Sequence, residues 1–463
     1  MATIKFRDPV HNFIHFSSEE VKLINSGVIQ RLRGIRQLAM ACLVYPGALH
    51  TRFDHTLGVA HVAGQMAHEL GLDEEERGLV RQAALLHDVG HGPFSHISES
   101  ALDRYGDRDS IPADLKKEKI HEVVTGHIIQ TDHDLVRILG AERCERIAKL
   151  LAKGVGDPIL RSIVSGPLDA DKQDYLLRDS KFAGVNYGIF DIGQLHRSLT
   201  TETLDEQKEL LIRPHGVHAV EQFVMAKYYL TTMVYRHKVR LITDQMFLRA
   251  IILGVEKDGN KDLHSLYAFK NDSAFYENYL KWHDAKFMLK FGEEGHPGAK
   301  CTQLLDRLTK RNLLKQVLAC PIGEFPGETR EKIMDIIKPE NAKLRSAIET
   351  KIAEELAKQT GAPVDPDFTV LHAYQIKSVR ESSRNDEASI LVSKKPLPPR
   401  PFEEESVLFF SINEKLSDKY VEVYAPVHWA DHSERTSKLR VIIPLIKDII
   451  VTTIGTTQTG ETK

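Results

Sequence analysis

The sequence contains little cysteine. Its 463 residues include only four, Cys42, Cys144, Cys301 and Cys320, and no two of them form a CxxC pair. A small secreted scaffold held by disulfides is therefore excluded, and a reducing compartment suits these thiols. We expect a cytoplasmic protein.

Long apolar stretches and an apolar leader are also missing. The N-terminal MATIKFRDPVHN meets charge at once, and the most apolar late stretch, VIIPLIKDIIV, is interrupted by Pro444, Lys447 and Asp448. A membrane-spanning helix needs about 20 mostly apolar residues, and a signal peptide needs an apolar core. The sequence therefore predicts neither membrane insertion nor secretion.

The chain has no strong excess of charge of either sign. Its 62 Lys and Arg residues and 65 Asp and Glu residues give a formal net charge of −3. No overall attraction to nucleic acid or anionic lipid is expected, so a polyanionic ligand must be held by a local cluster. A Walker loop, a GxGxxG motif and internal repeats are absent as well. The hydrophobic content of 42% is typical of a globular protein.

The most informative stretch is RGLVRQAALLHDVGHGPFSH, which spans residues 77–96. Val80, Ala83, Ala84 and His87 follow the i, i+3, i+4, i+7 pattern of one helical face. Adjacent helical residues lie about 100° apart, so His87 and Asp88 can both face one point beside the helix. A metal ion would fit at that point.

Two further stretches supply the same kinds of side chain. A lone histidine is usually a hydrogen-bonded core or surface residue, so His87 alone is weak evidence. However, HTRFDHTLG places His55 at the start of a second helix, and LDADKQDYLLRD places Asp171 at the start of a third. Two imidazoles and two carboxylates suit divalent Fe, Mn, Mg, Co, Ni or Zn, and the ligand types do not choose among these ions.

The order H…HD…D, with HDVGHGPFSH and LDADKQDYLLRD around it, resembles the HD-domain phosphohydrolase superfamily, specifically its deoxynucleoside triphosphate triphosphohydrolase branch. The likeness extends from KFRDPVHNFIHF to VYRHK near Lys238 and then fades. It implies a mainly α fold, in which a phosphodiesterase-like helical HD core is joined to a C-terminal α+β lobe. It also implies the metal ligands His55, His87, Asp88 and Asp171.

The remaining pattern predicts the order of elements. Alternation over residues 3–16 predicts an N-terminal β-hairpin, and LLIRP predicts a strand pair. Residues 217–253 are expected to form one long helix, and residues 105–119 a surface loop. The sequence becomes β-rich after Gly361, in DFTVLHAYQIK, ASILV, SVLFFSI and YVEVYAP. We therefore expect two domains, 1–360 and 361–463.

The expected chemistry is hydrolysis of a phosphate ester. A divalent ion can polarise a phosphoryl oxygen and acidify a water molecule. Glu99 follows His96 by three residues, so a helix beginning there would let the carboxylate orient the imidazole for proton transfer to the departing 5′ oxygen. The resemblance implies the same pairing and adds His91 and His121 to the active site.

The resemblance also implies a substrate pocket for a deoxynucleoside triphosphate. Arg52, Lys172 and Lys227 match phosphate-binding positions, although Lys227 stands where an arginine is usual. Next to the aromatic walls of such a pocket, a 2′-hydroxyl would have no hydrogen-bond partner. The pocket would therefore favour deoxyribose over ribose. The remaining matched pocket positions are Gln37, Leu38, Tyr175, Asp179 and Tyr235.

Relatives in this branch include tetramers that nucleotides activate at subunit interfaces. The resemblance therefore implies a homo-oligomer, a tetramer or a dimer, with GTP, dGTP or another dNTP as effector. Asn25 stands where vertebrate members use an aspartate to recognise guanine. The matched regulatory positions are Gln30, Arg33, Arg213, His237 and Lys238.

Three other functions fit parts of the sequence. Another HD phosphohydrolase, such as a nucleotidase or phosphodiesterase, would share the ligands. A nucleic-acid-binding or nuclease role would use RLRGIR and the basic residues 236–240, but the balanced net charge does not favour it. A regulatory nucleotide sensor is disfavoured by the complete ligand quartet.

Overall fold

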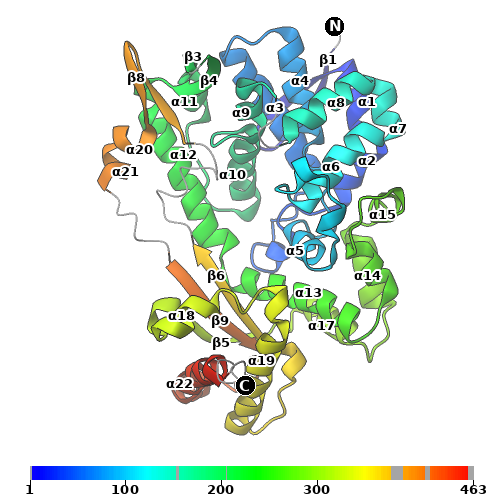
Figure 1. Cartoon of the computed structure of the whole chain (residues 1–463), viewed down its shortest axis with the longest axis vertical. Coiled ribbons are helices and arrows are strands. Elements are labelled where there is room, and N and C mark those ends of the chain that lie inside the picture. The colour runs from blue at the N-terminus through cyan, green and yellow to red at the C-terminus, as the bar shows by residue number, and fades with distance from the viewer. Residues whose placement is uncertain (1–2, 153–155, 205, 377–388, 412–417, 457–463) are drawn as a thin grey trace. The chain divides into compact units, whose positions relative to one another are not determined.

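The computed structural model shows a predominantly α-helical chain, as expected (Figure 1). It describes residues 3–152, 156–204, 206–376, 389–411 and 418–456. The chain forms two compact units. The first contains the described parts of 1–237, 264–287 and 378–414, and the second contains those of 238–263, 288–377 and 415–463.

This grouping differs from the expected division at residue 360. Strand β5 (Lys315–Pro321) forms an antiparallel ladder with β9 (Asp418–Ala425). Helix α19 (Ala342–Thr360) packs against α22 (His432–Thr456). Both contacts join residues before and after position 360. The change from helical to β-rich sequence therefore marks no boundary between the units.

The first unit opens with the predicted hairpin, in which β1 (Thr3–Asp8) pairs antiparallel with β2 (Asn12–Ser17). Helix α3 then packs against both α4 and α10. The helices up to the sheet are α1 (Ser18–Ile24), α2 (Gly27–Arg31), α3 (Arg52–Glu69), α4 (Glu74–Leu86), α5 (His96–Tyr105), α6 (Ile120–Thr131), α7 (His133–Leu139), α8 (Ala141–Leu151), α9 (Pro158–Ser165), α10 (Ala170–Ala183) and α11 (Ile192–Arg197).

Local capping fixes where the three central helices begin. Thr51 and Asp54 form a capping box at α3, and Asp73 and Glu76 form one at α4. At α10, the Asp169 side chain accepts the Lys172 backbone N–H. Each cap satisfies backbone donors that have no partner within the helix. His55 and Asp171 consequently lie in first turns, whereas His87 directly follows the last residue of α4.

The predicted strand pair is present in a four-stranded sheet of order β3-β4-β7-β8. The part expected as a strand in SVLFFSI is instead helical, because Ser406 caps it by accepting the Phe409 backbone N–H. That strand prediction was wrong. The elements here are β3 (Leu199–Leu204), β4 (Gln207–Ile212), β7 (Leu391–Lys394), β8 (Leu397–Pro401), α20 (Phe402–Glu405) and α21 (Val407–Ser411).

The single helix expected over residues 217–253 is interrupted. Helix α12 (Val217–Leu230) continues into a π-helical segment, Thr231–Tyr235, before α13 (Lys238–Glu256) begins. The Thr231 and Thr232 hydroxyls donate to carbonyls four residues earlier, which competes with regular helical bonding. The break directs Tyr235 to Asp179 of α10, as the site below shows.

The second unit is built around a three-stranded sheet of order β5-β9-β6, with β6 at Val370–Ile376. Its core includes Ile352 of α19, Val421 and Val423 of β9, and Ile446 and Ile450 of α22. One face of the interrupted apolar stretch at 441–451 therefore contributes to a globular core. None of the described helices combines the length and apolarity of a membrane span.

The other helices of the chain's second half are α14 (Lys261–Tyr267), α15 (Ser273–Tyr279), α16 (Asp284–Phe287), α17 (Lys300–Thr309) and α18 (Gly327–Ile333).

Candidate metal centre and active site

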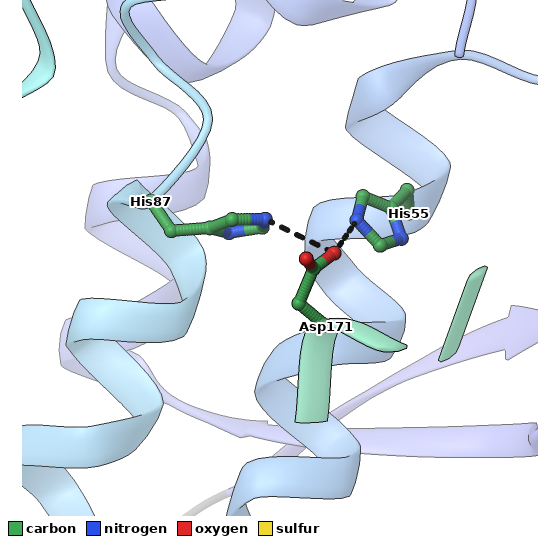
Figure 2. Close-up of side chains that lie close together, drawn as sticks. All are labelled: His55, His87 and Asp171. Atoms are coloured by element: carbon green, nitrogen blue, oxygen red, sulfur yellow. Dashed lines mark hydrogen bonds and ion pairs between the residues drawn. The ribbon is translucent and has the colours of Figure 1, made fainter. Parts of the chain in front are cut away.

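Side chains from α3, α10 and the end of α4 meet at one point (Figure 2). His55 Nε2 lies 2.9 Å from Asp171 Oδ1, and His87 Nε2 lies 3.8 Å from the same oxygen. One ligand atom from each of the three residues lies within 4.8 Å of the others. The structure thus brings together three of the four expected metal ligands.

The hydrogen bonds of both imidazoles fix which nitrogen faces this point. His87 Nδ1–H donates to the Ala84 carbonyl over 2.7 Å, and His55 Nδ1–H donates to Asp174 over 2.8 Å. In its neutral form, each ring would therefore present the lone pair of Nε2 to the site. His87 Nε2 is buried without a hydrogen-bond partner. A lone pair facing carboxylate oxygens is repelled unless a cation lies between them, so the donor set fits a divalent metal ion.

Asp88, the fourth expected ligand, lies beside this group. Its Oδ1 is 3.4 Å from His87 Nε2 and 3.3 Å from His91 Nε2, and its Oδ2 accepts from Arg52 Nη1 over 2.5 Å. Burial raises the pKa of this carboxyl, but Arg52, His87 and His91 together hold it well below its usual range. Asp88 is therefore ionised, with one oxygen held by Arg52.

The site is also adapted to hold positive charge. Burial lowers the pKa of His55, but hydrogen bonds to Asp171 and Asp174 outweigh it and raise the value to about 10. Burial raises the pKa of Asp171, but the His55 bond and the nearby His87 bring it down to about 2. Without a metal ion, a proton on His55 therefore carries the charge that these carboxylates require.

A second group of histidines lies next to Asp88. The rings of His91 and His121 stack with centroids 3.9 Å apart, and His96 meets His91 edge-on at 5.7 Å. Burial, followed by the charges of Arg52 and His121, holds the pKa of His91 well below its usual value. His96 is exposed at the start of α5.

Glu99 was expected to orient His96, and the structure shows it bonded to His121. Its Oε2 accepts from His121 Nδ1 over 2.5 Å, and it also accepts the backbone N–H groups of Ile120 and His121. Burial raises the pKa of Glu99, but these bonds lower it below its ordinary value. Glu99 therefore anchors the start of α6 and the imidazole of His121.

Asp179, Tyr175 and Tyr235, three of the expected substrate-pocket residues, come together. Asp179 accepts from His50 Nε2 over 2.7 Å and from the Tyr235 hydroxyl over 2.5 Å. Tyr175 meets Tyr235 edge-on, with centroids 6.3 Å apart. Gln37 is buried, and its Oε1 has no hydrogen-bond partner. Leu38 packs in a small cluster that includes Tyr235.

The three expected phosphate-binding cations have different surroundings. Lys172 Nζ donates to Asp169 over 2.5 Å and to the Gly166 carbonyl over 3.0 Å, so its charge is engaged within the protein. Arg52 Nη2 is buried without a partner, whereas its Nε donates to Ser95. Lys227 is half-buried on α12. The structure therefore leaves a free donor on Arg52 but pairs the ammonium of Lys172.

The expected regulatory residues lie in several segments of the first unit and at the start of α13 in the second. Arg33 donates to Gln30 over 2.8 Å and stacks on Phe53. Arg213 donates to the Arg197 carbonyl. The other two are His237, which lies edge-on to Tyr45, and Lys238, which begins α13 in the second unit.

Several residues of the site were missed by the sequence analysis. Asp174 follows Asp171 by three residues in one helix, and this spacing could have indicated that both carboxylates face His55. His11, which also contacts Asp174, and His50, which contacts Asp179, carry no local signal. Their partners lie 163 and 129 residues away in the chain.

Two protein-family models match the chain. Residues 52–165 match the HD domain, and residues 190–393 match the HD associated region. The chain is 31% identical to the uncharacterized protein YwfO of Bacillus subtilis, over 69% of this chain and 73% of that protein. It is 28% identical to the deoxynucleoside triphosphate triphosphohydrolase SAMHD1 of Gallus gallus, over 72% of this chain and 58% of that enzyme.

A solved structure shares the fold over nearly the whole chain. A hypothetical protein from Aquifex aeolicus superposes with a TM-score of 0.68 at 25% identity, covering 95% of this chain and 100% of that one. By contrast, the chain spans less than three-fifths of the length of several curated relatives that it matches.

The helical fold and the His, His-Asp, Asp arrangement define a protein of the HD-domain class. The chain belongs to the family that carries the HD domain and the HD associated region, and it is similar to the deoxynucleoside triphosphate triphosphohydrolase SAMHD1.

Proposed function

We propose that the protein hydrolyses deoxynucleoside triphosphates to deoxynucleoside and inorganic triphosphate, with a divalent metal ion held by His55, His87, Asp88 and Asp171. The observation that carries this proposal is the buried, unpartnered Nε2 of His87 facing two carboxylates. When bound, the ion would supply Lewis-acid polarisation of a phosphoryl oxygen and a more acidic water molecule.

The histidines beside Asp88 would provide the proton for the leaving group. His96, which is exposed beside His91, would act as the general acid for the 5′ oxygen of the nucleotide. Glu99 would act through its neighbours, because it fixes His121, on which His91 stacks, and His91 in turn contacts His96. His91 remains neutral near pH 7, because its pKa is lowered by burial.

The group around Asp179 would select deoxyribose. Each Asp179 oxygen already accepts one hydrogen bond, and a carboxylate oxygen can accept a second, from the sugar 3′-hydroxyl. The rings of Tyr175 and Tyr235 would wall the sugar, and an added 2′-hydroxyl pressed against them would lose its water without a replacement. Gln37 Oε1 and Arg52 Nη2 offer an unpartnered acceptor and donor to the nucleotide.

Product analysis tests this proposal. The purified protein is incubated with each dNTP and several divalent metals, and the phosphate products are separated. Intact inorganic triphosphate is expected, because only cleavage between the 5′ oxygen and the α-phosphorus releases it. Pyrophosphate or a nucleoside monophosphate would contradict the proposal and indicate another HD phosphohydrolase. Ribonucleoside triphosphates serve as the control for sugar selection.

We further propose that the protein is a cytoplasmic homo-oligomer activated by GTP, dGTP or another dNTP. Its similarity to SAMHD1 supports this regulation, together with the exposed Arg33 that stacks on Phe53 and donates to Gln30. An effector must couple energetically to the active site, so its addition should change turnover cooperatively. Sedimentation and turnover measured with and without GTP or dGTP test both points; a single species with hyperbolic kinetics under all conditions would contradict them.

A further inference from the structure

The tip of the N-terminal hairpin reaches a carboxylate behind the candidate metal centre. His11, in the turn between β1 and β2, donates from Nε2 to Asp174 Oδ1 over 2.6 Å. The other oxygen of Asp174 accepts from Nδ1 of the expected ligand His55 over 2.8 Å. The Asp174 side chain is completely buried, so its hydrogen bonds decide its orientation.

Arg178 completes the ring of contacts around Asp174. Its Nε and Nη2 donate to the two Asp174 oxygens over 2.8 and 3.0 Å, and its Nη1 donates to Asp8 over 2.9 Å. The second oxygen of Asp8 accepts the backbone N–H groups of Val10 and His11, each over 2.8 Å. The hairpin therefore contacts Asp174 directly through His11 and indirectly through Asp8.

The backbone of α3 leaves no room for Asp174 to move. A Cβ built on Gly58, one turn after His55, would lie 1.9 Å from Asp174 Oδ1 and 2.4 Å from Arg178 Nη2. The carboxylate is thus held between α3, Arg178 and the hairpin. Partners of this kind fix the tautomer and ring orientation of a metal-binding histidine, and losing them typically weakens metal binding about 10-fold to 100-fold.

We propose that the β1–β2 hairpin is part of the metal centre, with His11 as a positioning residue that holds Asp174 in the orientation that fixes His55. This inference rests on the proposed metal centre. His11 itself contacts neither the metal ligands nor the substrate pocket among the interactions described. Its effect is on the affinity for metal ions, through Asp174 and then His55.

A purely structural role for the hairpin is separable, because a second anchor holds it at another place. Arg81 of α4 donates from Nη2 to the His15 carbonyl of β2 over 2.8 Å and from Nε to Glu20 over 2.5 Å. Arg81 also donates from Nη1 to the Ala60 carbonyl of α3 over 3.3 Å, and none of these contacts involves Asp174 or His55. Arg81→Gln therefore loosens the hairpin without removing a contact of Asp174 or His55, and it is the matched control.

The test measures metal binding directly. The full-length protein is stripped with a chelator, and Mn²⁺ is titrated into the wild type, His11→Leu, His11→Gln and Arg81→Gln by calorimetry, with folding checked by circular dichroism. His11→Leu is expected to weaken Mn²⁺ binding about tenfold or more. His11→Gln retains an N–H donor and should recover most of the affinity. Arg81→Gln should lower the melting temperature while leaving Mn²⁺ affinity unchanged.

The possible failures differ. Equal Mn²⁺ affinity of His11→Leu and wild type would overturn the hairpin inference but leave the metal centre standing. A loss in Arg81→Gln as large as that in His11→Leu would also overturn it, because general loosening would then be the cause. Absence of Mn²⁺ binding by the wild type would overturn both. If His11→Leu does not fold, Asp8→Asn takes its place in the Mn²⁺ titration. This substitution weakens the hydrogen bond through which the hairpin holds Arg178 beside Asp174.

Discussion

Single residues in the candidate site carry polar atoms that the chain leaves without partners. Gln37 Oε1, Arg52 Nη2 and His87 Nε2 are buried and have no hydrogen-bond partner within the part of the chain that the structure describes. Leaving a buried polar group unsatisfied costs about 1–3 kcal/mol. Such groups are tolerated where a ligand satisfies them, so these three atoms are the ones that the proposed metal ion and nucleotide would engage.

Replacing Asp171 tests its assignment as a metal ligand. Asp171→Asn removes one ligand charge but keeps the side-chain size, and in the metal-free protein it also weakens the ion pair with His55. Metal affinity is expected to fall by about 100-fold or more, because loss of an outer partner of a ligand alone typically costs about 10-fold to 100-fold, with loss of turnover and a modest fall in the melting temperature of the metal-free protein. Calorimetry and product release measure these effects. Full turnover by Asp171→Asn would refute the assignment of this ligand.

Replacing Gly58 tests the close approach of α3 to Asp174. The Cβ of Gly58→Ala would overlap Asp174 Oδ1 and Arg178 Nη2, both buried, so the unfolding free energy should fall by about 2–3 kcal/mol in urea. The control is Gly126→Ala in α6, where a Cβ meets nothing within 4 Å. There alanine should be neutral or stabilising by about 1 kcal/mol. Equal effects at the two positions would contradict the geometry.

At the scale of elements, one buried carboxylate joins three parts of the second unit. Glu349 of α19 accepts from Arg345 over 2.9 Å, from Arg249 of α13, and from the Leu371 backbone N–H of β6 over 2.9 Å. Burial raises the pKa of Glu349, but Arg249 and Arg345 outweigh it and hold the pKa below its ordinary value of 4.5. The ionised form of Glu349 is therefore the one that stabilises this unit.

This contribution to stability should disappear in acid. Because the pKa is lowered on folding, the contribution is complete above about pH 4.5 and is lost as the pH falls through the lower folded-state value. Glu349→Gln should reduce the unfolding free energy by about 3 kcal/mol at pH 7, since two arginines lose their partner, and by less as the pH falls through the lowered folded-state pKa of Glu349. Denaturation at several pH values measures this. Glu354→Gln, at an exposed position of α19, should change stability by under about 0.5 kcal/mol. A pH-independent effect of Glu349→Gln would contradict the argument.

At the scale of the whole molecule, the metal centre and the Glu349 cluster belong to different compact units. All four expected ligands lie in the first unit, and Glu349 lies in the second. Binding only to the folded state stabilises by about 2.7 kcal/mol when the free ligand is at 100 times its Kd. Metal ions should therefore raise the thermal stability of the unit that contains the ligands.

Calorimetric unfolding with and without a chelator checks this at the level of the two units. Removing the metal should lower the transition of the first unit, and Glu349→Gln should lower that of the second. If the units unfold together, both changes should shift the one transition. If two transitions are seen and the metal shifts only the one that Glu349→Gln lowers, the metal would bind in the second unit. That result would contradict the assignment of the ligands to the first unit.

The sequence alone determined the features that depend on neighbours within a turn or two. The mainly α fold and the hairpin over residues 3–16 were predicted correctly, because alternation and helical periodicity are local. The motif around His87 and Asp88 was equally visible, because two adjacent chemical groups need no tertiary information.

Only the tertiary structure decided which distant groups meet. His55 and Asp174 are 119 residues apart in the chain, and Glu99 bonds with His121 although its spacing suggested His96. The pairing of β5 with β9 likewise depends on contacts between remote segments. Such contacts follow from the packing of whole elements, and a buried carboxylate takes the donors that this packing brings within reach.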